Sequence, residues 1–220
     1  MFRAMAIKEL RETRGIILLA LAAYGYAVVT QIIPRLPFGN WREITMPFVE
    51  DTFIPWLWLI SIPMTIALGL RQTLGESIPG TYPFLFHRPA GRRWLIGMKL
   101  LVGIGVYLTC ASIPILVLGL LAATPGTYAG PFAWSMTVPC WIVWFGMTLL
   151  YLGAFLTGIR PGRWFGTRIL PMAAAALAMG IGIAIHFDLE EPMWSVLLFL
   201  AADVWFIAMI LFVVRTRDYP

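Results

Sequence analysis

The stretch MWSVLLFLAADVWFIAMILFVV, residues 193–214, decides the class of fold. It carries a single charged side chain, Asp203. Roughly 20 apolar residues in an α-helix cross a hydrocarbon core of about 30 Å. Lipid offers backbone groups no hydrogen-bond partner, so a spanning segment has to pair them within its own helix. The stretch therefore predicts a membrane-spanning helix.

The composition extends this prediction to the whole chain. The 220 residues are 60% hydrophobic and 12% charged, and the mean hydropathy is +0.83. A soluble domain carries about 25% charged residues, which excludes an ordinary water-soluble globule. The length fits one membrane domain over residues 1–220. We expect an all-α, polytopic membrane protein.

Five further apolar stretches precede residues 193–214, and together they predict six spans. Prolines interrupt four of these stretches, where they predict kinks, and the glycines of MGIGIAI (residues 179–185) predict close helix packing. The six spans are expected at about residues 15–33, 53–70, 97–123, 132–158, 169–187 and 193–214.

The basic residues predict the orientation of these spans. With six spans, 14 of the 16 Lys and Arg fall on one side, leaving only Arg35 and Arg42 on the other. The positive-inside rule then places both termini, and the segment between spans two and three, in the cytoplasm. The net charge of +5 is explained in the same way and needs no nucleic-acid partner.

The N-terminal stretch MFRAMAIKELRETRG (residues 1–15) places apolar residues at helical spacing among charged ones. This pattern predicts a short helix on the inner membrane surface before span one. The alternative is a charged segment that only sets topology. A cleaved signal peptide is disfavoured, because only about five apolar residues precede its candidate cleavage site.

The segment ESIPGTYPFLFHRPAGRRWLIGMK, residues 76–99, is the least apolar long stretch between two spans. Pro79-Gly80 stops the preceding helix, and Thr81 can cap a short new one. Phe84, Leu85 and Phe86 give that helix an apolar face. An apolar face held in water predicts a docking site for a partner. The alternative is that these aromatic residues lie in the lipid interface.

The order of these features resembles the membrane subunits of ABC-2 type transporters. The pattern E-x-x-x-G-T-x-x-x-L-x-x-x-P-x-x-R, followed by a lysine in the next span, begins at Glu76 and reaches Lys99. AIKELRE, residues 6–12, resembles the N-terminal elbow helix of that family. The six-span plan with both ends inside is also similar, so the resemblance covers the whole chain.

The resemblance implies a permease subunit of an ATP-driven exporter in the cytoplasmic (inner) membrane. It implies an elbow helix around Lys8, Glu9 and Glu12, and a coupling helix that docks on a separate ABC ATPase. The implied coupling residues are Glu76, Gly80, Thr81, Phe84, Leu85, Phe86, Arg88 and Pro89. A second permease chain, identical or different, and membrane lipid are the other implied partners.

The chain has no G-x-x-x-x-G-K-[ST] phosphate loop, so ATP and Mg²⁺ are expected on the partner ATPase and no cofactor on this chain. It also has no HExxH, no G-x-S-x-G and no cysteine spacing typical of a metal site. We therefore expect a chain that is not itself an enzyme. The alternatives are a membrane enzyme acting on lipid and an assembly subunit without transport.

Asp203 is the one acid well inside a predicted span. Ionisable residues within membranes are costly and often functional, so a role in the transport pathway is one hypothesis. The other is a hydrogen bond from Asp203 to a hydroxyl on a neighbouring helix. Cys110 and Cys140 lie in apolar runs and are expected to be buried thiols.

Overall fold

The computed structural model describes residues 2–32, 48, 52–77, 91–127, 131–160, 165–189 and 192–216. The regular structure within these residues is entirely helical. The elements in chain order are α1 (Phe2–Ile32), α2 (Ile54–Ser77), α4 (Arg92–Ala123), the 3₁₀ turn η2 (Trp134–Thr137), α5 (Val138–Ile159), α6 (Phe165–Leu189) and α7 (Pro192–Thr216).

Six of these helices are long and apolar enough to cross a membrane. The chain is therefore an all-helical, multi-pass membrane protein, as the sequence predicts. The helices extend beyond several predicted spans: α4 has 32 residues, and at 1.5 Å per residue it is about 48 Å long. It exceeds an apolar core of about 30 Å by several turns.

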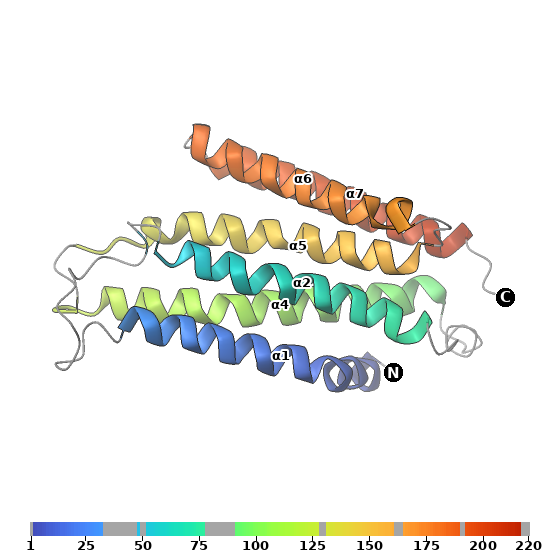
Figure 1. Cartoon of the computed structure of the whole chain (residues 1–220), viewed down its shortest axis with the longest axis horizontal. Helices are drawn as coiled ribbons and strands as arrows, with labels where there is room; N and C mark the ends of the chain where they lie inside the picture. Colours follow the sequence, from blue (N-terminus) through green and yellow to red (C-terminus); the bar gives the residue numbers. More distant parts are fainter. Residues whose placement is uncertain are drawn as a thin grey trace.

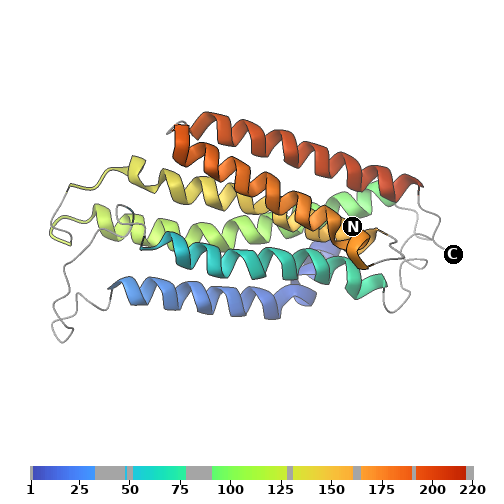
Figure 2. The same cartoon turned by 45° about the horizontal axis from the view of Figure 1, so that its top comes forward.

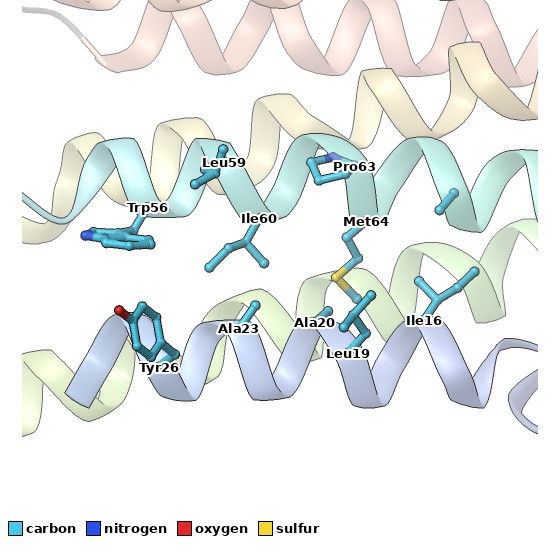
Figure 3. Close-up of a pocket in the computed structure, with 11 residues that line it drawn as sticks. Ile16, Leu19, Ala20, Ala23, Tyr26, Trp56, Leu59, Ile60, Pro63 and Met64 are labelled. Atoms are coloured by element: carbon cyan, nitrogen blue, oxygen red, sulfur yellow. The ribbon is translucent and has the colours of Figure 1, made fainter. Parts of the chain in front are cut away.

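Helix α5 lies at the centre of the bundle (Figure 1). It packs against α2, α4, α6 and α7, and residues 146–159 are all buried. Helix α1 packs against α2 and α4, while α6 and α7 lie together on the other side of α5 (Figure 2). Since most of α1 and α7 faces outward, these two helices supply much of the surface available to lipid.

Glycines set how closely α5 is approached by its neighbours. A Cβ on Gly69 of α2 would lie 2.7 Å from the carbonyl oxygen of Tyr151, so a larger residue there would push the two helices apart. The expected packing role of residues 179–185 is correct for Gly182, whose Cβ would overlap the Phe199 ring. It is wrong for Gly180, where an added Cβ would have no atom of a neighbouring element within 4 Å.

The prolines also divide into two groups. Pro63, Pro114 and Pro171 lie inside helices, as expected. Pro139 lies in the first turn of α5, just after the spanning segment Trp134–Ile159 changes from the 3₁₀ turn η2 to α-helix. There its missing N–H removes no helical hydrogen bond.

One end of the bundle collects the positive charge. We call it the basic end: α1, α4 and α6 begin there, and α2, α5 and α7 end there (Figure 1). All eleven Lys and Arg of the described residues lie toward this end. The grouping agrees with the predicted topology.

The N-terminal segment, residues 2–14, is continuous with the span that follows it. A separate surface helix ending near residue 15 is expected from the sequence, but α1 runs without a break from Phe2 to Ile32. Its first turns nevertheless bend away from the axis of the rest of α1 (Figures 1 and 2).

Candidate functional site

An ion pair is buried at the basic end of the bundle. The Nζ atom of Lys99 in α4 lies 2.7 Å from Oε1 of Glu9 in α1. Each residue is only 1% exposed. Removing two charges from solvent is costly unless they are paired and hydrogen-bonded, so this contact demands a defined geometry around it.

Helix α2 provides further hydrogen-bond partners for Lys99. Lys99 donates a second hydrogen bond from Nζ to the carbonyl oxygen of Gln72, at 3.3 Å. The Gln72 side chain donates in return from Nε2 to the carbonyl oxygen of Lys99, also at 3.3 Å. These reciprocal bonds fix α2 and α4 to each other at one level of the bundle.

Tyr151 adds the central helix to the network. Its hydroxyl donates to Oε1 of Gln72 at 2.6 Å and also lies 3.3 Å from the carbonyl oxygen of Lys99. Gly103, one turn beyond Lys99, makes room for this hydroxyl, because a Cβ at that position would overlap the Tyr151 oxygen and lie 2.6 Å from Gln72 Oε1. We call Glu9, Gln72, Lys99 and Tyr151 the polar network.

The network has a particular place in the chain. Gln72 lies near the end of α2 and Lys99 near the start of α4, so both are on the helices that flank residues 78–90. Glu9 adds the N-terminal segment, and Tyr151 adds α5. The four side chains thus join both flanks of the predicted coupling segment to the centre of the bundle.

The structure separates the three residues of the predicted elbow. Lys8 and Glu12 form a pair at 3.5 Å on the outer face of α1, and their side chains are 43% and 37% exposed. Glu9 points inward to Lys99. An exposed pair one turn apart contributes little to stability, so Glu9 is the energetically important member.

The predicted coupling residues fall largely outside the described residues. Glu76 lies in the last turn of α2, although its side chain is not among those described. The remaining seven lie outside the described ranges: Gly80, Thr81, Phe84, Leu85, Phe86, Arg88 and Pro89. Their role stays a prediction.

Asp203 contacts a neighbouring helix in the way one of the two hypotheses expects. The Thr148 hydroxyl of α5 donates to Oδ2 of Asp203 at 2.8 Å. The other oxygen, Oδ1, is shielded from solvent and has no hydrogen-bond partner. The contact joins α7 to α5, and a role of Asp203 in a transport pathway stays a prediction.

Metal-ligating side chains do not converge in the described part of the chain. No group of three or more His, Cys, Asp or Glu residues is arranged there to hold a metal ion. Cys110 and Cys140 are both buried, as their apolar surroundings in the sequence predict.

Sequence reasoning missed three of the residues that matter here. Gln72, Gly103 and Tyr151 were not singled out, and Lys99 entered only as part of a motif. A glutamine beyond the apolar part of α2, and a lysine about two turns into α4, are polar residues that a membrane helix has to pair. That signal was available, but it does not say which helix supplies the partner.

Comparison with known proteins leaves the chain without a match. No family model, no curated protein and no solved structure matches it.

Proposed function

We propose that this chain is the permease subunit of an ATP-driven transporter of the ABC-2 type, and that it works as an exporter. The observation that carries the proposal is the polar network. It joins the N-terminal segment and the two helices flanking residues 78–90 to the central helix. A permease driven by a separate ATPase needs a rigid path of this kind from its docking segment into the bundle.

Other helix pairs are joined by neutral or single polar contacts, such as Tyr24–Ser61 and Thr148–Asp203, whereas the polar network combines an ion pair with several hydrogen bonds. Most of the protein's interior is apolar, and apolar packing is non-directional. A buried ion pair with several hydrogen bonds resists relative movement of its helices more specifically. The ion pair and its hydrogen bonds involve the two helices that flank residues 78–90. A partner that moved residues 78–90 would therefore act on the polar network through α2 and α4.

In the proposed orientation, the basic end faces the cytoplasm, where the positive-inside rule places it. A membrane-impermeant thiol reagent tests this on intact cells, using single cysteines in a chain without Cys110 and Cys140. We expect labelling at residue 125 and none at residue 90. Labelling of residue 90 in intact cells contradicts the orientation.

The function itself is tested by co-purification. The tagged chain, extracted from its native membrane, should retain a polypeptide that carries a G-x-x-x-x-G-K-[ST] motif and hydrolyses ATP. Phe84→Glu and Leu85→Glu should abolish this association, because buried apolar anchors typically contribute about 2 kcal/mol or more each at an interface.

Glu12→Gln is the matched control, since it alters an exposed charge of α1 outside the predicted docking segment. Folding of every variant is checked by monodispersity in detergent. Absence of an ATPase from the parent chain, or undiminished association of well-folded Phe84→Glu and Leu85→Glu chains, refutes the proposal.

A further inference from the structure

The N-terminal segment has little apolar packing to hold it in place. Of the side chains from residues 3–14, only Glu9 and Thr13 are buried, and both are polar. The two large aliphatic residues Ile7 and Leu10 are 47% and 43% exposed. Thr13 donates its hydroxyl within α1, to the carbonyl oxygen of Glu9, so it gives no side-chain link to another helix.

Glu9 makes a buried, directional contact between this segment and another helix of the bundle. Its Oε1 atom reaches Lys99 across 90 residues of sequence. The second carboxylate oxygen, Oε2, is shielded from solvent and has no hydrogen-bond partner. A buried acceptor that lacks a partner is unfavourable, so the bond to Lys99 is what offsets the burial of this carboxylate.

Lys99 is held more firmly than Glu9. Its neighbourhood includes the reciprocal bonds with Gln72, and the Tyr151 hydroxyl lies close to its backbone. The bonds to Gln72 and Tyr151 connect Lys99 to α2 and α5, whereas Glu9 is the member of the polar network from α1. Lys99, Gln72 and Tyr151, on three packed helices, thus form a binding site for the Glu9 carboxylate of the N-terminal segment.

We propose that the Glu9–Lys99 ion pair is a positioning joint. It fixes the N-terminal segment relative to the helices that flank residues 78–90, and this position sets how strongly ATP turnover is coupled to the chain. The second clause rests on the proposed function; the first does not. Glu9 and Lys99 touch neither ATP nor substrate in this account, and they act through the position of α1.

The test measures the position of the segment directly. Spin labels are placed at Ala4 in the N-terminal segment and at Leu101 in α4, both exposed, in a chain with Cys110 and Cys140 replaced by alanine. Pulsed electron paramagnetic resonance in lipid nanodiscs then gives the distribution of distances between the labels. The parent and the Glu12→Gln control should give one narrow distribution, and Glu9→Gln a broad one.

A double variant separates positioning from mere stability. Glu9→Leu with Lys99→Met replaces the ion pair by apolar contacts, which often restores stability but lacks direction. We expect this chain to regain the melting temperature of the parent while its distance distribution stays broad. A narrow distribution in Glu9→Gln overturns the joint, and so does a narrow distribution in the double variant.

The proposed effect of the ion pair on ATP turnover is measured separately. The reconstituted complex of the chain with its co-purified ATPase should lose roughly fivefold or more of its ATP turnover in Glu9→Gln, with the amount of bound ATPase unchanged. Unchanged ATP turnover alongside a broad distance distribution overturns the proposed effect on coupling. If the parent chain retains no ATPase, the proposed function and the effect on coupling fail together. The distance measurement still tests whether the Glu9–Lys99 pair positions the N-terminal segment.

Discussion

Glu9 and Asp203 are both carboxylates on membrane-spanning helices, but Glu9 is buried and Asp203 is only partly buried. Glu9 lies at the basic end and faces a lysine that is itself held by two other helices. Asp203 lies in the middle of α7 and receives one hydrogen bond from a hydroxyl of α5. Among the described residues, no basic side chain forms an ion pair with Asp203.

The two carboxylates stabilise the bundle in different ways. A carboxylate paired with a cation holds helices in one arrangement, because breaking the pair leaves an isolated charge. A carboxylate bonded to a hydroxyl gives a weaker contact whose charge is not neutralised. We therefore expect the basic end to be the more rigid part of the bundle, and the contact between α5 and α7 to be the more easily altered.

The largest expected effect comes from removing one partner of the ion pair. Lys99→Met leaves the Glu9 carboxylate buried without its cation, which should cost about 3–5 kcal/mol of unfolding free energy. Equilibrium unfolding in mixed detergent and SDS micelles measures the change. Glu12→Gln, which breaks only the exposed pair with Lys8, should cost no more than about 0.5 kcal/mol. Equal losses in the two variants would show that the burial of the pair has no energetic consequence.

A smaller loss of stability is expected from a substitution that crowds the polar network without removing either charge of the ion pair. Gly103→Ala places a methyl group against the Tyr151 hydroxyl, and overpacking of this kind typically costs about 1–3 kcal/mol. Gly105 lies two residues further along α4 with nothing within 4 Å, so Gly105→Ala should be neutral or slightly stabilising. Thermal unfolding of both variants in detergent measures the difference. The proposed packing of α4 on Tyr151 is wrong if the two substitutions behave alike.

The smallest effect is expected at Asp203. Asp203→Leu removes the hydrogen bond between α7 and α5, at about 0.6–2 kcal/mol, and leaves the Thr148 hydroxyl the carbonyl oxygen of Phe145 as its acceptor, whereas Asp203→Asn keeps the link between helices and should cost less. Thr148→Val tests the same bond from the other side and should cost at least as much, because it leaves both oxygens of the Asp203 carboxylate without a hydrogen-bond partner. If Asp203→Asn is stable and assembled but abolishes ATP turnover of the complex, then the charge itself has a function beyond the hydrogen bond.

Much of the fold follows from the sequence, and the polar network does not. Apolar stretches longer than the membrane thickness leave few choices beyond a helix, so the six spans are found at nearly their expected places. Periodicity also identifies Glu9 as part of a helix. It cannot show that Glu9 turns inward while Lys8 and Glu12 turn outward, because that depends on the bend in α1 and on the neighbour it meets.

The partners of Glu9 come from distant parts of the chain. Lys99 is 90 residues away, and Tyr151 lies in an apolar stretch that offers no polar pattern to draw attention to it. Their convergence is decided by how α2, α4 and α5 pack, with Gly69 and Gly103 permitting the close approach. Single-sequence reasoning identifies such residues as polar groups in need of partners, and the three-dimensional packing supplies the pairing.

The most direct test of the account asks what touches residues 78–90 in the native membrane. A photo-crosslinking amino acid at Leu85, and a second one at Pro125 at the opposite end of the bundle as the control, capture the neighbours of each site for mass spectrometry. The account predicts that the Leu85 adduct contains a polypeptide with a G-x-x-x-x-G-K-[ST] motif and that the Pro125 adduct does not. Adducts of Leu85 with lipid alone, from a chain that is folded and active in its membrane, would contradict it.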